Sequence, residues 1–228
     1  MVHAPLPQQT VNPLFTELGN YDDRHVNVGQ YLAKANQPFI KQYAQNVGPM
    51  HSFGIEVVNV WSVNRPGCRQ NYRHTLTNKR LLFHGTLKEN VFPILCDGFD
   101  MSLSDTSSFF GAGLYFSDCV TKAASYANEY RSAVGSYAAR NPEMYGYLFL
   151  CEVALGRQKR YLDADNNACQ DLAGHNSVYS QGSYGAMSAT AQYSQDVMII
   201  PGKIRFFKRN RFHYNVYVVY ATNQVNIR

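Results

Sequence analysis

Three short segments carry side chains that could bind or activate a ligand. His84 is followed by Gly85 at the end of an apolar run, Tyr115 follows a pair of glycines, and Tyr126 comes one predicted helix later. A glycine at a strand end lets a ligand approach backbone N–H and C=O groups, which is the contact that a planar carboxamide needs. Tyrosine rings can stack on an aromatic ring. The alternative is a hydrogen-bonded histidine with two packed tyrosines, and the pattern alone favours it because the chain has 17 tyrosines.

The cysteines indicate neither a metal site nor a disulfide framework. They are odd in number and include no C-x-x-C pair, and no H-x-x-x-H lies nearby. We therefore predict no metal, and reduced thiols inside the cell, in either the nucleus or the cytoplasm. The cysteines are Cys68, Cys96, Cys119, Cys151 and Cys169.

A basic stretch over residues 203–211 could bind a polyanion. Its cations are interleaved with phenylalanines, and the net charge of +5 adds weak support for such a partner. One interpretation is contact with nucleic acid. The other, which the period-2 pattern favours, is an antiparallel hairpin with apolar and basic residues on opposite faces. The cations are Lys203, Arg205, Lys208, Arg209 and Arg211, and the phenylalanines are Phe206, Phe207 and Phe212.

The composition and length of the chain indicate what kind of fold can position these residues. Its 228 residues are 45% hydrophobic and 16% charged, which is enough for one domain with a real core. The longest uncharged apolar runs are far shorter than the roughly 20 residues that a membrane span needs, so we expect no membrane contact. We predict an N-terminal arm over residues 1–20 and one domain over residues 21–228.

The predicted elements are mixed α+β, with mostly antiparallel strands and no regular strand–helix alternation of a doubly wound sheet. A Gly- and Ser-rich loop covers residues 102–113, and a long loop covers residues 170–194. The predicted strands are residues 53–63, 80–84, 147–154, 196–200, 204–207 and 211–220. The predicted helices are residues 22–47, as one helix or as two parted at Pro38, residues 87–96, ended by Gly98, and residues 120–130, capped by Asp118.

Six blocks occur in a fixed order along the chain. They are residues 78–86 (NKRLLFHGT), 111–118 (GAGLYFSD), 121–126 (TKAASY), 150–156 (LCEVALG), 174–178 (GHNSV), and 214–220 with 223–226 (YNVYVVY and NQVN). They resemble the NRxLLWHGS, GxGIYFAD, SKSANY, LxEVALG, GxHSV, and NEYIVY with AQVN blocks of the catalytic domain of poly(ADP-ribose) polymerases, which are diphtheria-toxin-like ADP-ribosyltransferases. The resemblance runs from about residue 30 to residue 228. It implies two packed, mostly antiparallel sheets with flanking helices, and an NAD pocket between the sheets.

The resemblance also implies roles for individual residues in binding NAD as a substrate. His84 would hydrogen-bond a ribose hydroxyl, and the backbone of Gly85 would bind the nicotinamide carboxamide. Tyr115 and Tyr126 would stack on the two faces of the nicotinamide ring.

Three further positions complete the binding site that the resemblance implies. Thr86, where the family usually has serine, would contact the adenosine ribose. Phe116 would also belong to the NAD-binding set, and Lys122 would border the nicotinamide side. The loop over residues 100–110 would lie over the pocket.

Two departures from the family blocks bear on activity. Val216 stands where the family has its catalytic glutamate, so His84, Tyr115 and Val216 take the places of the family's catalytic residues. That carboxylate polarises the incoming sugar hydroxyl in polymerising members, so its loss should stop chain elongation. Ala123 replaces a serine that donates a hydrogen bond to the carboxamide, and such a loss costs on the order of 1 kcal/mol in NAD binding.

These features predict a mono-ADP-ribosyltransferase that modifies proteins, itself included, with no chain elongation. Members with an aliphatic third residue resemble enzymes in which the acceptor side chain supplies the missing carboxylate. The alternative is a weakly active or inactive module that binds NAD or ADP-ribose, because both Val216 and Ala123 depart from the family. A third hypothesis is modification of nucleic acid, or recruitment to it, through residues 203–211.

Overall fold

The computed structural model describes residues 27–29, 47–50, 55, 57, 60–64, 68–127, 146–186, 191–194, 197–199 and 203–228. The predicted arm lies outside these residues, as does most of the helix predicted over residues 22–47. Within that helix Asn27–Gly29 is instead the strand β1, which pairs antiparallel with β2 (Ser62–Asn64). The helix prediction is wrong there, because asparagine and glycine are weak helix formers and pairing with a distant strand decides the local structure.

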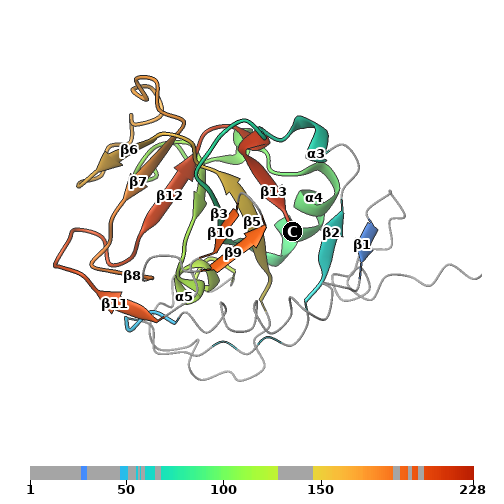
Figure 1. Ribbon diagram of the computed structural model, residues 1–228, viewed down its shortest axis with the longest axis horizontal. Coiled ribbons are helices and arrows are strands. Elements are labelled where there is room, and N and C mark those ends of the chain that lie inside the picture. Colours follow the sequence, from blue (N-terminus) through green and yellow to red (C-terminus); the bar gives the residue numbers. More distant parts are fainter. Residues whose placement is uncertain are drawn as a thin grey trace, which may run out of the picture.

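A five-stranded sheet runs through the centre of the molecule, in the order β13-β5-β3-β10-β9 (Figure 1). Strands β3 and β5 pair antiparallel along seven residues, from Lys79 opposite Ala154 to Gly85 opposite Leu148. Strand β10 pairs parallel with β3, and the other pairs are antiparallel. The bounds are β3 Lys79–Gly85, β5 Leu148–Ala154, β9 Ala191–Ser194, β10 Val197–Ile199 and β13 Val225–Ile227.

A four-stranded sheet lies beside it, in the order β4-β12-β7-β6 (Figure 1). Strand β12 is antiparallel to both of its neighbours, and β6 and β7 are parallel. The mostly antiparallel α+β class predicted from the sequence is confirmed. The bounds are β4 Leu114–Phe116, β6 Gln158–Tyr161, β7 Ser177–Ser180 and β12 Val216–Val219.

The basic stretch does not form the hairpin that the sequence favoured. Strand β11 (Ile204–Phe206) pairs antiparallel with β8 (Tyr184–Ala186), and β12 begins only at Val216. Ser183 lies between the two strands of the predicted hairpin. Its carbonyl accepts from Phe207 N–H, and its own N–H donates to the Phe212 carbonyl. The prediction of a long loop over residues 170–194 is also wrong in part, because this range contains β7, β8 and β9, whose serine, glycine and alanine residues hide their strand pattern.

The described helices are short and flank the sheets. Helix α4 (Lys88–Asp97) ends as predicted at Gly98, whose positive φ of 90° glycine tolerates and whose N–H donates to the Ile94 carbonyl. Helix α3 is Cys68–Asn71, and α5 is Val120–Ala124. In Figure 1, α3 and α4 lie on the right, beyond β13, and α5 lies in the lower part of the view, below β12. None of the described helices has the length and apolarity that crossing a membrane requires.

The main apolar core lies between the two sheets and beneath α4. It combines Leu82 of β3 and Val153 of β5 with Phe116 of β4 and Tyr217 of β12, and Leu95 of α4 closes one side. The sheets also join through their backbones: Phe83 and Ser117 exchange two hydrogen bonds of 2.8 and 2.9 Å. This junction brings the end of β3 against the end of β4, which are the two segments that carry the predicted site.

Candidate active site

His84 follows the junction of the sheets and contacts the strand that carries Tyr115. Its Nδ1 lies 2.9 Å from the Tyr115 backbone oxygen. A carbonyl can only accept, so Nδ1 donates its proton, and Nε2 of the neutral ring is left as a hydrogen-bond acceptor. The ring packs edge-on against Phe99 at 4.9 Å and is tilted on Phe116 at 5.5 Å, between ring centroids.

The surroundings of His84 keep its ring neutral. Removal of the imidazole from water lowers its pKa below the ordinary 6.5, and the hydrogen bond to Tyr115 opposes that shift only in part. A neutral ring with an accepting Nε2 is suited to hold a hydroxyl group, such as that of a ribose. In the predicted contact with NAD, Nε2 of His84 would therefore accept the hydrogen bond that the ribose hydroxyl donates.

Tyr115 holds the end of the loop over residues 100–110. Its hydroxyl accepts from Phe110 N–H at 2.9 Å and donates to the Gly111 carbonyl at 2.8 Å. Burial raises the pKa of Tyr115 to about 12, so the phenol stays protonated and neutral. The loop begins at Asp100, whose carboxylate accepts from Ser102 N–H. The tyrosine therefore positions this loop, and its stacking on nicotinamide stays a prediction.

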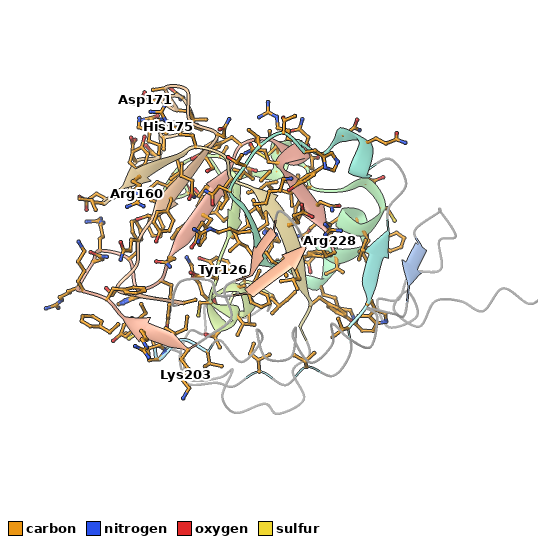
Figure 2. All side chains as sticks on the ribbon, viewed as in Figure 1. Tyr126, Arg160, Asp171, His175, Lys203 and Arg228 are labelled. Atoms are coloured by element: carbon orange, nitrogen blue, oxygen red, sulfur yellow. The ribbon has the colours of Figure 1, made fainter. Side chains whose placement is uncertain are left out.

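Gly85, Ala123 and Tyr126 come together where α5 packs on the end of β3. A Cβ atom at Gly85 would lie 1.8 Å from the Ala123 carbonyl oxygen and 3.4 Å from the Tyr126 Cβ. A side chain at this position would push α5 away, so the close packing requires glycine. Tyr126 is 42% exposed, follows α5 by two residues, and lies near the middle of the view in Figure 2. The shared contact of Gly85 and Tyr126 with nicotinamide stays a prediction.

The other three predicted NAD-binding residues contact neighbouring side chains of the protein. Phe116 is 2% exposed and packs under His84, so it supports the imidazole rather than presenting a surface. The Thr86 hydroxyl accepts from the Asn90 side chain of α4 at 3.1 Å. The Ala123 methyl group belongs to an apolar cluster with Leu81, Phe83 and Val120. Contacts of these three residues with NAD stay predictions.

Val216 shares a sheet face with Tyr115. Tyr115 is paired with Val218 on β12, and Val216 lies two residues along the same strand. The Val216 side chain is 5% exposed and packs in an apolar cluster with Phe212 and Val218. The first residue of β12 therefore offers no polar group at the place where the family resemblance puts a glutamate.

A buried polar network beside Val216 was missed from the sequence. Lys122 Nζ donates to the Asn215 backbone oxygen at 2.9 Å, and Asn215 Nδ2 donates to Asp118 Oδ2 at 2.7 Å. Tyr217 Oη donates to the same Asp118 oxygen at 3.2 Å. Burial raises the pKa of Asp118 and lowers that of Lys122 to about 8. Together these groups fix the start of β12 against α5.

The prediction that Asp118 caps a helix is wrong. Cys119 is the first residue before α5 and makes no side-chain cap, while the Asp118 carboxylate points to β12. A position just before a helix suggested a cap, but its partners are distant along the chain. The helix is shorter than predicted: it covers Val120–Ala124, residues 125–127 are not helical, and residues 128–130 lie outside the described residues. Among the residues that the structure describes, no three His, Cys, Asp or Glu side chains gather as a metal site.

Comparison with known proteins identifies the family. Residues 36–228 match the Poly(ADP-ribose) polymerase catalytic domain. The chain belongs to this family. The matched range contains every predicted site residue, from His84 to Val216, and the predicted family and fold class are confirmed. The boundary between an arm and a domain after residue 20 stays a prediction.

The polymerase relatives are much longer than this chain. Poly [ADP-ribose] polymerase 2-A of Oryza sativa subsp. japonica is 32% identical over 199 residues, which are 83% of this chain and 29% of that protein. Poly [ADP-ribose] polymerase 2 of Homo sapiens is 31% identical over 199 residues, 83% of this chain and 32% of that protein. Poly [ADP-ribose] polymerase 1 of Caenorhabditis elegans is 27% identical over 201 residues, 83% of this chain and 20% of that protein. The chain thus spans about a third of their length or less.

Proposed function

We propose that this catalytic domain moves one ADP-ribose from NAD to a protein side chain, releases nicotinamide, and does not extend the product into a chain. The observation that carries the proposal is the apolar, 5% exposed side chain of Val216 at the glutamate position. Valine has no group that can hydrogen-bond or deprotonate the hydroxyl of an acceptor sugar. The proposed acceptors are other proteins and the chain itself.

The remaining groups suit cleavage of the bond between nicotinamide and ribose. Nicotinamide leaves with the electron pair of that bond, and the acceptor heteroatom then bonds to the same carbon and releases its proton if it carries one. The site has to bind and shield an oxocarbenium-like state, and it does not need a base of its own if the acceptor is a carboxylate. His84 can hold a ribose hydroxyl through Nε2, and Gly85 and Tyr126 lie next to each other on the adjoining segments.

Incubation with radiolabelled NAD tests this function. We expect nicotinamide release and a single ADP-ribose on each modified side chain, read by mass spectrometry. His84→Ala should lower nicotinamide release about 100-fold, because the ribose is no longer held in register. His213→Ala, which removes an exposed histidine, is the matched control and should leave the rate unchanged. Absence of both nicotinamide and modified protein at saturating NAD would overturn the proposal.

The role of Val216 is tested by restoring the carboxylate. Val216→Glu should allow addition of a second ADP-ribose to the first, visible as products longer than one unit. Glutamine has nearly the same shape as glutamate but no charge, so Val216→Gln should still add only one ADP-ribose to each modified side chain. Melting temperatures of both variants show whether the apolar cluster tolerates the new side chains. Chains of ADP-ribose formed by the unaltered protein would contradict the proposal directly.

A second candidate function is a module that binds NAD or ADP-ribose without turnover. The observation that favours it is Ala123, whose methyl group lies in an apolar cluster and offers no hydrogen bond to a carboxamide. In that case a non-hydrolysable NAD analogue would raise the melting temperature, yet NAD would yield no nicotinamide. His84→Ala would then weaken binding only, whereas in a transferase it also removes turnover.

A further inference from the structure

The cations of residues 203–211 form an exposed basic strip on the β8–β11 sheet and the loop after it. Within the part of the chain that the structure describes, Arg211 lies 3.8 Å from the Asp163 carboxylate, and no ion pair engages the other four. Figure 2 shows Lys203 pointing out from the lower edge of the molecule. The exposed cations that define the basic strip are Lys203, Arg205, Lys208, Arg209 and Arg211.

Two large aromatic side chains of the basic strip are also exposed. Phe206 is 58% exposed and Phe207 is 45% exposed. The sequence pattern favoured burial of the apolar residues on one face, and this part of the prediction is wrong for both rings. The reason is the strand pairing: β11 contacts β8 alone, so Phe206 packs edge-on against Tyr184 at 5.4 Å and keeps one side open to solvent.

The loop that follows β11 is held in one conformation. Asn210 N–H donates to the Ser183 hydroxyl at 2.9 Å, and Asn210 Nδ2 donates to the carbonyls of Gln181 and Gly182 at 3.1 Å each. These bonds tie the residues between Phe207 and Phe212 to the chain before β8. The charged side chains therefore project from a fixed backbone, which lowers the ordering penalty when a ligand binds.

We propose that the basic strip binds single-stranded nucleic acid. Five exposed cations on one short segment can contact successive phosphates, and exposed phenylalanine rings offer faces on which bases stack whatever their sequence. An acidic protein segment would use the cations but would leave the two exposed rings without a matching partner. The combination of open aromatic faces and unpaired cations along one fixed segment therefore favours nucleic acid.

The basic strip ends beside the candidate active site. A Cβ atom at Gly185 would lie 2.3 Å from Asn215 Nδ2 and 2.9 Å from Phe207 Cε2, so the Phe207 ring and the Asn215 amide lie close together. Asn215 directly precedes Val216. A nucleic acid strand bound on the basic strip would consequently pass next to the start of β12. The binding itself does not depend on the proposed transferase activity.

A fluorescence anisotropy titration with a labelled oligouridylate of roughly 12 nucleotides tests the proposal. We expect binding whose association constant falls between about 50 and 200 mM salt, with a logarithmic slope near −0.7 for each phosphate contact. The variant Arg205→Gln/Lys208→Gln/Arg209→Gln should weaken binding about tenfold or more and reduce the slope by about 2. Phe206→Leu should weaken binding about tenfold with an unchanged slope, because it removes stacking and no charge.

The matched control removes three positive charges from residues outside the basic strip. Arg73→Gln/Lys88→Gln/Arg157→Gln changes three exposed cations outside the basic strip and should bind the oligonucleotide like the unaltered protein. Melting temperatures confirm that every variant is folded. Equal weakening by both triple variants, full binding by Phe206→Leu, or no binding at 50 mM salt would each overturn the proposal. So would tight binding of polyglutamate in place of the oligonucleotide, which would indicate an acidic protein partner.

Discussion

The protonation state of His84 determines which contacts this residue can make. With Nδ1 bonded to the Tyr115 carbonyl, a neutral ring offers an accepting Nε2, whereas a protonated ring would offer a second donor. The pKa of His84 is lowered chiefly because the ring is removed from water. The residue is therefore in its accepting form at neutral pH, and acidification would turn it into a donor at the position where a hydroxyl is to be held.

The lowered pKa of His84 makes stability depend on pH. The unfolded chain takes up the proton near the ordinary 6.5, while the folded chain resists it, so stability is full above that value and falls as the pH decreases below it. We expect the free energy of unfolding of the unaltered protein, measured with urea between about pH 5 and pH 8, to fall more steeply on acidification than that of His84→Gln. A difference between the two proteins that is independent of pH would contradict this assignment.

Single residues show how far the sequence could predict the site. His84 and Gly85 lie at the end of a strand that the sequence located, whereas β4, which carries Tyr115, was not among the predicted strands. The structure joins the two segments at the junction of Phe83 and Ser117. The polar network around Asp118 could not be predicted, because Asn215 and Tyr217 lie 97 and 99 residues away along the chain. No local pattern records a partner at such a distance.

Helix α5 and strand β3 depend on each other through Gly85. The packing leaves no room for a side chain between the strand end and the Ala123 carbonyl. We expect Gly85→Ala to destabilise the domain by about 1–3 kcal/mol and to abolish the thermal shift caused by an NAD analogue, because α5 must move with Tyr126. Gly146→Ala is the control: among the described residues its Cβ would meet the Ala127 Cβ at 3.3 Å and the Ala127 oxygen at 3.6 Å, which are far looser contacts. Equal melting temperatures for both variants would show that α5 adapts freely.

The start of β12 depends on the carboxylate of Asp118. This fully buried group accepts hydrogen bonds from Asn215 and Tyr217, and its charge offsets that of Lys122. Asp118→Asn should destabilise the domain by about 1–3 kcal/mol, because the amide oxygen accepts more weakly than a carboxylate and no longer offsets the charge of Lys122. Asp97→Asn, at the exposed end of α4, should change the free energy of unfolding very little. Chemical denaturation measures both, and unchanged stability of Asp118→Asn would contradict the network.

Elements with local signals were predictable, and elements with distant partners were not. Helix α4 has an apolar face and the glycine that ends it, so its range was predicted within a residue. Strand β11 was predicted too, but with the wrong partner, because β8 has the sequence YGA and no strand-like alternation. Of the described residues in the predicted strand over residues 53–63, residues 62 and 63 belong to β2, and residues 55, 57, 60 and 61 are not in a strand.

At the scale of the whole molecule, the two sheets form one unit, because side chains from both sheets make up the apolar core between them. Phe116 and Tyr217 face Leu82 and Val153 across this core, while Tyr115 and Val216 project from the opposite face of the four-stranded sheet. Residues on both faces of β4 thus contribute to the same region: Phe116 packs under His84, and Tyr115 orders the neighbouring loop. Loss of core packing would therefore disturb the site without altering a residue in it.

Arg228 links the outer strand β13 to its neighbour β5 in the five-stranded sheet. Its guanidinium contacts the carboxylate of Glu152, which is 4% exposed on β5, and its backbone N–H donates to the Leu150 carbonyl (Figure 2). Removal of the cation leaves a buried carboxylate uncompensated, so Arg228→Met should lower the free energy of unfolding by about 3 kcal/mol.

Substitution of both partners separates this pair from the rest of the sheet. Glu152→Gln/Arg228→Met leaves no buried charge, so we expect the double variant to be more stable than Arg228→Met alone. Urea denaturation of the four proteins gives the coupling energy, and an unchanged dependence on urea would show that the domain still unfolds as one unit. If the changes in the free energy of unfolding were simply additive, the ion pair would not hold β13 on the sheet. The antiparallel pairing of residues 225–227 with β5 would then hold this strand alone.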